Sequence, residues 1–220
     1  MTFNKNLSEY KSIVFDCDGV LINSNSIKCD AFFFAANIFG SDLASRLVDY
    51  HIKNGGISRY EKFTYFCNYL INDNRPEIYD KLVRRYSHYL SLALKDAEVI
   101  DCLVDLKNAT PNANWSVVSG SDQDELRDLL LCHKISSFFE AGIFGSPDTK
   151  VEILEREIYK GNICENSLFI GDSKYDYYSS NKFNLDFIFV SNWTEVSDWR
   201  SWTSSNNIFS TASITDLINI

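Results

Sequence analysis

The chain has 220 residues, of which 45% are hydrophobic and 23% are charged, so it is long enough for one full domain and a smaller second one. A formal net charge of −9 argues against a general affinity for nucleic acid or for anionic membranes. The polar N-terminus lacks the apolar segment of a signal peptide, and no apolar run reaches membrane-spanning length. The six cysteines contain no CxxC pair, so neither a zinc site nor a disulfide framework is indicated. We expect a cytoplasmic protein, a monomer or a homodimer, that binds neither nucleic acid nor a membrane.

Two carboxylates follow the first apolar run of the chain. Residues 13–15 are Ile-Val-Phe, which predicts a short buried strand, and Asp16 and Asp18 come directly after it. Because side chains alternate along an extended chain, the two aspartates point to the same side, and Gly19 lets the backbone turn away. Two like charges this close need a cation between them or a proton on one of them. Taken alone, the same residues also fit a cap followed by an Asp-Gly turn.

Residues 24–96 have the pattern of a small all-helical region. Apolar and aromatic residues recur there at spacings of three and four, and no clear strand pattern interrupts them. Three such faces are Ala31, Phe32, Ala35, Ala36 and Phe39; Tyr60, Phe63, Phe66, Cys67 and Leu70; and Ile78, Leu82, Tyr86, Tyr89, Leu90 and Ala93. We expect these stripes to form a hydrophobic core rather than a ligand pocket.

From about residue 99 onward, predicted strands alternate with predicted helices. The strands are 115–118, 143–144, 167–170, 187–190 and a short last candidate at 208–209, and the helices are 99–109, 122–132 and 151–159. This alternation predicts an α/β fold with a mostly parallel sheet flanked by helices, in which ligands bind beyond the carboxyl ends of the strands. Asp16, Asp18, Ser119 and Asp172 all fall at such ends.

The Ser119-Gly120-Ser121 segment lies between a predicted strand and a predicted helix. Unpaired N–H groups at the start of a helix favour an anion, so the Ser119 hydroxyl and the Gly120 N–H are candidate phosphate ligands. The same segment supplies a helix cap, Ser121 or Asp122, and both roles are compatible.

Residues 146–150 open the helix predicted at 151–159 and place Lys150 at its start, where the helix dipole disfavours a cation. A solvated surface lysine is one explanation. A nearby anion or carboxylate cluster is the other, and we favour a role in holding a nucleophile and a transferred phosphoryl group.

Asp172 and Asp176 add two carboxylates after the strand predicted at 167–170. Together with Asp16 and Asp18 they make an oxygen-rich, negative pocket that suits Mg²⁺. The histidines show no metal-like spacing and are expected in solvent or in the core; they are His51, His88 and His133.

Taken in order, these stretches resemble the motifs of the haloacid dehalogenase-like (HAD) superfamily. Residues 16–19 (Asp-Cys-Asp-Gly) are similar to its first motif, Ser119 to the second, Lys150 to the third, and Gly171-Asp172 with Asp176 to the fourth. The helical region resembles the C1-type cap of the phosphoglycolate phosphatase and β-phosphoglucomutase branch. The resemblance implies a Rossmann-like core domain of residues 1–23 and 97–220, and a mobile cap domain of residues 24–96.

The resemblance also implies roles for the motif residues. Asp16 would be the nucleophile that forms an aspartyl-phosphate, and Asp18 would be the general acid and base. Mg²⁺ would be held by the side chains of Asp16 and Asp172 and by the backbone carbonyl of Asp18, with Asp176 behind them. The phosphoryl oxygens would be bound by Ser119, Gly120 and Lys150.

The expected function is therefore that of a magnesium-dependent phosphatase acting on a small phosphomonoester, such as a sugar phosphate or a phosphoglycolate-like compound. Two alternatives remain open: a phosphomutase that uses the same residues, and a module that binds a phosphate ester without turnover. Substrate choice is expected in the cap, where Gly55 and Gly56 would permit a close backbone approach and Lys53 or Arg59 would meet an anionic group of the substrate, although a plain surface loop fits equally well. The true dehalogenases of the superfamily lack the second aspartate of the first motif, so Asp18 argues against dehalogenation.

Overall fold

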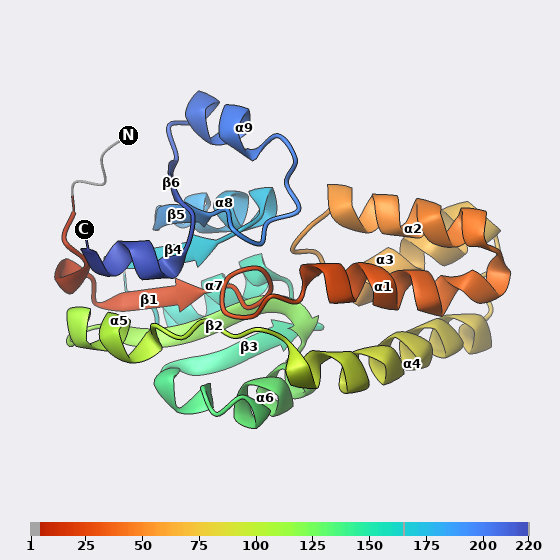
Figure 1. Cartoon of the computed structure of the whole chain (residues 1–220), viewed down its shortest axis with the longest axis horizontal. Helices are drawn as coiled ribbons and strands as arrows, with labels where there is room; N and C mark the ends of the chain where they lie inside the picture. Colours follow the sequence, from red (N-terminus) through yellow and green to blue (C-terminus); the bar gives the residue numbers. More distant parts are fainter. Residues whose placement is uncertain (1–4, 165, 220) are drawn as a thin grey trace.

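The computed structural model describes residues 5–164 and 166–219 of the chain. In this part of the chain six strands form one sheet in the order β3-β2-β1-β4-β5-β6, and all neighbouring strands pair in parallel. The expected α/β fold with a Rossmann-like sheet is confirmed. Figure 1 shows that a group of helices inserted after β1 extends beyond the tip of that strand.

The bounds of the elements follow the alternation expected from the sequence. The strands are β1 (Ser12–Phe15), β2 (Asn114–Asp122), β3 (Gly142–Ser146), β4 (Ser167–Gly171), β5 (Asp186–Val190) and β6 (Phe209–Thr211). The helices of the inserted region are α1 (Asn25–Ala36), α2 (Ser41–Lys53), α3 (Arg59–Tyr65) and α4 (Pro76–Ala93), with the short η2 (Asn37–Phe39), η3 (Phe66–Ile71) and η4 (Leu94–Asp96). The helices around the sheet are α5 (Leu103–Ala109), α6 (Gln123–Cys132), α7 (Lys150–Tyr159), α8 (Lys174–Asn181) and α9 (Trp199–Ser205), with the short η1 (Leu7–Glu9), η5 (Ser136–Phe138) and η6 (Ile214–Asn219).

Both faces of the sheet are apolar because a parallel sheet is covered on each side. Phe15, together with alternate residues of the neighbouring strands, packs in a cluster that includes leucines of α5, α6 and η6. Val14 and Phe169 point the other way and pack against Ile153 and Leu154 of α7. These two layers fix the positions of the strand tips, where the motif residues lie.

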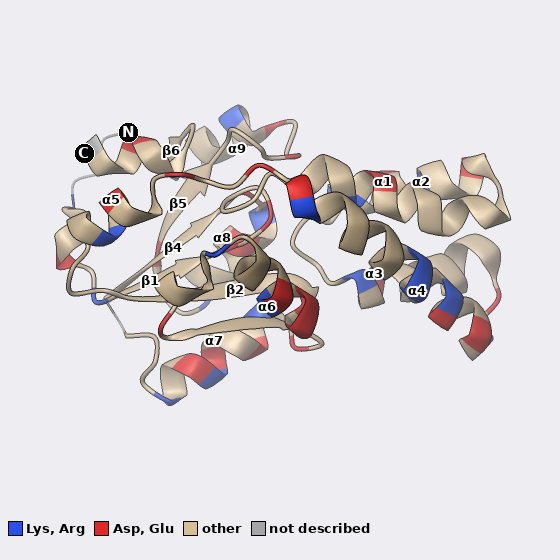
Figure 2. Cartoon of the chain, turned by 60° about the horizontal axis from the view of Figure 1, so that its bottom comes forward, with Lys and Arg blue, Asp and Glu red and all other residues tan. Residues whose placement is uncertain are grey.

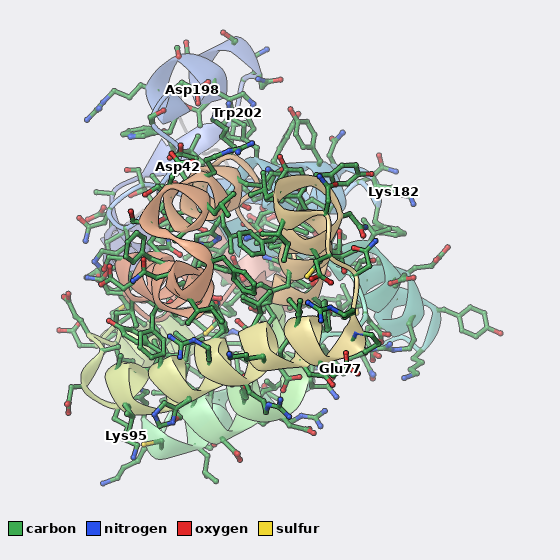
Figure 3. The ribbon with its side chains drawn as sticks, turned by 90° about the vertical axis from the view of Figure 1, so that its right-hand side faces the viewer. Asp42, Glu77, Lys95, Lys182, Asp198 and Trp202 are labelled. Atoms are coloured by element: carbon green, nitrogen blue, oxygen red, sulfur yellow. The ribbon has the colours of Figure 1, made fainter. Side chains whose placement is uncertain are left out.

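The helical region between β1 and α5 has a hydrophobic cluster of its own. Its buried members are Ala31, Phe32, Ala35, Ala36, Ala44, Leu47, Phe63, Phe66, Cys67, Leu82, Tyr86, Leu90 and Leu94. Figure 3 looks onto this region from its outer end, with Glu77 in the first turn of α4 and Lys95 just after the last turn. The aromatic stripes expected from the sequence therefore pack mainly against one another.

The segment between the helical region and the sheet differs from the expectation. A helix was expected over residues 99–109, but α5 begins only at Leu103. Val99 instead forms an antiparallel bridge with Ile22, which ties the end of the inserted region to the chain just after β1.

The strand expected at residues 115–118 is longer than its apolar core. β2 continues to Asp122, which pairs with Ser146 of β3 after an irregularity in the register. Ser119 and Gly120 therefore lie within the end of a strand, and not at the start of a helix as expected. Asp122 is the N-cap of α6, and its side chain accepts hydrogen bonds from the first turn.

Charged residues of both signs are spread over the molecule. Figure 2 shows blue and red segments close together on α4 and on α7, so neither helix presents a face of a single sign in that view. None of the helices in the described ranges is both long and apolar enough to span a membrane.

Candidate active site

A cavity of about 50 Å³ lies between the strand tips and the helical region. We call its two sides the core wall, formed by Asp16, Asp18, Gly120, Ser121 and Asp172, and the helical wall, formed by Lys28, His51, Arg59, Lys62 and Tyr86. The space accommodates only a few water molecules, because one water needs roughly 10–15 Å³ by this measure. The structure therefore holds the helical region closed over the strand tips.

Lys150 joins two carboxylates of the core. Its Nζ lies 2.9 Å from Oδ1 of Asp16 and 2.5 Å from Oδ1 of Asp176, and all three side chains are buried. The position of Lys150 in the first turn of α7 follows from a capping box between Thr149 and Glu152. Lys150 thus contacts Asp16, the residue that it was expected to hold, and its catalytic role stays a prediction.

The buried surroundings of Asp16 shift the pKa of its carboxyl group. Burial raises the pKa of Asp16 to about 7, with further increases from the charges of Asp176 and Asp18, although the Lys150 ammonium opposes them. Its Oδ1 also accepts a hydrogen bond of 2.7 Å from the Cys17 N–H. Within the described ranges no hydrogen bond is made to Oδ2, which leaves that oxygen free for a ligand.

Three buried aspartates form a cluster suited to a hard cation. Carboxylate oxygens of Asp16, Asp172 and Asp176 all lie within 4.8 Å of one another. Burial, together with the charges of Asp16 and Asp176, holds the pKa of Asp172 well above its usual range. An excess of buried negative charge around oxygen-only donors fits Mg²⁺, which prefers a few carboxylates and water.

Asp176 differs from the other two because both of its oxygens are already used. Oδ1 accepts from Lys150, while Oδ2 accepts from the backbone N–H and the hydroxyl of Ser173, at 3.0 and 2.7 Å. In contrast, Asp172 accepts only from Asn25 Nδ2, at 2.9 Å to Oδ2, among the described side chains. Asp16 and Asp172 thus have oxygens available for a metal, whereas Asp176 positions Lys150 and the start of α8.

Asp18 is held by hydroxyl groups and an ammonium. Its oxygens accept from Ser24 Oγ at 2.5 Å and Ser121 Oγ at 2.9 Å, and the Nζ of Lys28 contacts Oδ2. Burial raises the pKa of this carboxyl, but the Lys28 charge and these hydrogen bonds outweigh burial and hold the pKa well below its usual range. Asp18 is therefore an ionised carboxylate in the closed arrangement.

The structure separates the residues that were expected to bind phosphate together. Ser119 is fully buried, its hydroxyl lies 3.3 Å from Oδ2 of Asp18, and it accepts from the Ser121 N–H. Gly120 and Ser121 line the cavity, and Lys150 lies behind Asp16. Gly120 is thus directly exposed to a ligand, while Ser119 supports Asp18.

The loop between α2 and α3 reaches the core at Gly56. This glycine has φ of +84°, a conformation that residues with a side chain avoid, and it lines the cavity with Gly55 and Ile57. A Cβ atom at Gly120 would lie far inside contact distance of the Gly56 carbonyl oxygen. The two regions therefore meet backbone to backbone at this point.

The two charged residues expected near a substrate occupy different places. Lys53 is exposed and lies outside the cavity lining, beside a neighbouring hollow. Arg59 does line the cavity, but its guanidinium pairs with Glu125 at 2.6 Å, donates to Ser87 at 2.9 Å and lies over the ring of Tyr86. Arg59 connects the helical region to α6 in this arrangement.

Several residues of the helical wall were not expected from the sequence. His51, which we expected in solvent or in the core, is buried against the cavity, and its Nδ1 lies 2.6 Å from the Nζ of Lys62. Burial, with the positive charge of Lys28, lowers the pKa of Lys62 to about 7. Burial, with the charge of Lys62, also holds the pKa of His51 well below its usual range.

The sequence contained one indication that residues of the helical region lie beside the first motif. Asn25, Lys28 and Phe32 follow one another at helical spacing directly after the first motif, so one face of α1 must lie over Asp18. Periodicity alone, however, did not distinguish that face from the apolar face of the same helix.

The sequence profile of haloacid dehalogenase-like hydrolases matches residues 13–190 of the chain. A search of curated proteins found no match. Among solved structures, a predicted phosphatase from Clostridium acetobutylicum is 20% identical, with a TM-score of 0.73 over 96% of this chain and 97% of that one. A β-phosphoglucomutase from Clostridium difficile is 17% identical, with a TM-score of 0.72 over 96% of this chain and 97% of that one. A predicted phosphoglycolate phosphatase from Haemophilus somnus 129pt is 17% identical, with a TM-score of 0.64 over 82% of this chain and 85% of that one.

At these identities the solved structures show a shared fold, whereas the sequence profile covers all four motif stretches and most of the chain. The chain belongs to the haloacid dehalogenase-like hydrolase family.

Proposed function

We propose that the protein is a magnesium-dependent phosphatase that hydrolyses a small phosphomonoester through an aspartyl-phosphate. The observation that carries this proposal is the state of Asp16. Asp16 lines the cavity; its Oδ1 is fixed by Lys150 and the Cys17 N–H, and its Oδ2 has no hydrogen-bond partner in the described ranges. A carboxylate that is held rigidly and has one free oxygen is suited to attack an electrophile.

In the first half-reaction an oxygen of Asp16 bonds to phosphorus, the bond from phosphorus to the leaving oxygen breaks, and Asp18 protonates that oxygen. In the second, water attacks the aspartyl-phosphate and Asp18 accepts its proton, which releases phosphate and restores Asp16. The closed arrangement matches the second half-reaction, because Asp18 is ionised beside Lys28. The first half-reaction needs a protonated Asp18. It therefore requires that the substrate draw Lys28 away from Asp18 so that this carboxyl can hold a proton.

The side chains of Asp16 and Asp172 and the backbone carbonyl of Asp18 would hold Mg²⁺. When bound, this ion would offset the repulsion between Asp16 and the phosphoryl group and stabilise the charge that develops during transfer. Lys150 and the Gly120 N–H would position the phosphoryl oxygens, Ser119 would support Asp18 from behind, and Asp176 would keep Lys150 in place.

Residues 24–96 would act as a mobile cap on a core of residues 1–23 and 97–220. The cavity in the closed arrangement holds only a few water molecules, so a substrate enters after the cap opens. Gly56 and Arg59 would contribute to substrate choice from the cap side of the cavity, whereas Lys53 would act only after a shift of its loop. An Arg59→Ala variant that changes selectivity among substrates would support this role, and equal kinetics across substrates would remove it.

A phosphomutase is the second candidate, because the small closed cavity limits the number of water molecules that compete with a second hydroxyl. A site that excludes water preserves an aspartyl-phosphate long enough for transfer to a second hydroxyl. The residues would be the same, so only the products distinguish the two reactions.

The test is a screen of phosphate esters, including hexose phosphates, phosphoglycolate and an aryl phosphate, with and without Mg²⁺. Release of free phosphate that depends on Mg²⁺ supports the phosphatase. An isomerised sugar phosphate without release supports the mutase. Binding without any turnover across the panel would overturn both and leave a module that only binds phosphate esters.

A further inference from the structure

A second cluster of metal-ligating side chains lies where the helical region meets the core. Ligand atoms of Cys29, His51 and Glu195 all lie within 4.8 Å of one another. The three come from different elements: Cys29 from α1, His51 from α2, and Glu195 from the loop between β5 and α9. The phosphatase mechanism uses none of them.

His51 points an unsatisfied atom into this cluster. The residue is only 5% exposed, and its Nε2 is buried without a hydrogen-bond partner in the described ranges. Nε2 lies 3.7 Å from Oε2 of Glu195, which is too long for a hydrogen bond. A buried imidazole nitrogen left unpaired costs free energy, so a ligand at this position would satisfy it.

Cys29 and Glu195 complete the donor set. The Sγ of Cys29 lies 2.8 Å from Oε1 of Glu195, and both side chains are partly buried. A thiol, an imidazole and a carboxylate are the ligands that Zn²⁺ takes in proteins, whereas Mg²⁺ takes oxygen ligands. The chemistry of this cluster therefore differs from that of the aspartate cluster on the core wall.

We propose that Cys29, His51 and Glu195 form a zinc site that fastens the helical region to the core. On binding, the Cys29 thiol releases its proton to solvent, and its sulfur, the Nε2 lone pair and a Glu195 oxygen bond to the ion. Because the ligands come from both regions, Zn²⁺ binds the closed arrangement in preference to the open one. Occupancy therefore inhibits any reaction that requires the cap to open.

The charges around the cluster are compatible with a cation. The Lys28 ammonium is neutralised by Asp18, with which it is in contact. The Nζ of Lys62 lies 2.6 Å from Nδ1 of His51, so the other ring nitrogen, Nε2, is the one directed at the cluster. A hydrogen bond on the second ring nitrogen is the usual arrangement around a histidine that binds a metal.

The experiment is a titration with Co²⁺, which reports thiolate ligation by its charge-transfer absorption, in saturating Mg²⁺ and without substrate. Wild type and Cys132→Ser, which removes an exposed thiol, are expected to bind one equivalent with that absorption, and equimolar Zn²⁺ should abolish it. Cys29→Ser should lose the absorption, and Glu195→Gln should retain it with an affinity at least about 10-fold weaker. Absence of the absorption in wild type, or its survival in Cys29→Ser, would overturn the site.

Two further measurements keep the result interpretable. Circular dichroism and thermal unfolding of the metal-free variants establish that each is folded; if Cys29→Ser is not, Glu195→Gln decides. Zn²⁺ should inhibit hydrolysis of an aryl phosphate by wild type but not by Cys29→Ser, and equal inhibition of both would remove the fastening role. Because the cobalt titration needs no turnover, its outcome does not depend on whether the protein is a phosphatase.

Discussion

The core wall and the helical wall of the cavity differ in how their charged groups are paired. On the core wall, Asp16 is held by Lys150 and Asp18 by Lys28, and each of these pairs is buried or nearly so. On the helical wall, the Nζ of Lys62 makes its described hydrogen bond only to His51, and Nε2 of His51 makes none in the described ranges. Asp16 and Asp18 on the core wall are thus paired with ammonium groups before a ligand arrives, whereas the helical wall has polar groups left for a ligand to satisfy.

The largest expected effect is the loss of turnover in Asp16→Asn, which removes the free nucleophilic oxygen of the core wall. Hydrolysis of an aryl phosphate with Mg²⁺ should fall on the order of 10⁴-fold or more, because a nucleophile cannot be replaced by its neighbours. Asp30→Asn, an exposed aspartate on α1, is the matched control and should retain full activity. Activity within about 10-fold of wild type in Asp16→Asn would rule out Asp16 as the nucleophile.

The second effect is on the free energy of unfolding. It tests whether the stability of the core wall depends on the ion pairs of Lys150. Lys150→Met leaves Asp16 and Asp176 buried without a cation, so the free energy of unfolding should fall by roughly 3–5 kcal/mol at neutral pH. Lys160→Met removes a half-exposed lysine on the same segment and should cost less than about 1 kcal/mol. Urea unfolding of both variants without metal makes the comparison. If Lys150→Met loses no more unfolding free energy than Lys160→Met, the ion pairs of Lys150 with Asp16 and Asp176 do not stabilise the core wall.

A third effect concerns the point where the two regions meet. Gly120→Ala places a methyl group against the Gly56 carbonyl of the closed arrangement, so closure should be hindered and kcat/KM should fall about 10- to 100-fold. The control is Gly55→Ala, which adds the same methyl group in the loop between α2 and α3. There the nearest atom is Ser173 Cβ, at an ordinary contact distance of 3.6 Å. Steady-state kinetics should separate the two variants, and urea unfolding of both measures any accompanying change in stability. Equal kinetics would mean that closure does not require this contact.

The core wall was predictable because its signals are local. An apolar run followed by carboxylates marks a strand tip, and the position of Lys150 against a helix dipole indicated a nearby anion. What the sequence did not reveal depends on distant pairing. β2 extends through Ser119 because Asp122 pairs with Ser146 across the sheet, and no local pattern carries that information.

The helical wall was less predictable for the same reason. Lys62 and His51 lie on helices whose apolar periodicity shows which face is buried, but not which helix packs against it. Glu195 lies in a loop without any motif, so only the folded chain brings it to Cys29. A wall assembled from four helices is a tertiary property, whereas a strand tip is a property of a short segment.

The smallest effect is a pH dependence of stability, which tests the free-energy cost of burying Lys62 in the helical wall. The pKa of Lys62 is lowered from 10.5 to about 7, so between these values the unfolded chain binds a proton that the folded chain does not, and the free energy of unfolding rises with pH. Lys62→Met removes the titrating group, so the stability of this variant relative to wild type should be greater at pH 7 than at pH 9.5. Urea unfolding at pH 7 and pH 9.5 measures the change, with exposed Lys53→Met as the control that shows no such trend. A stability difference that stays constant across this range would mean that Lys62 carries its proton in the folded protein, and that the helical wall is as well compensated as the core wall.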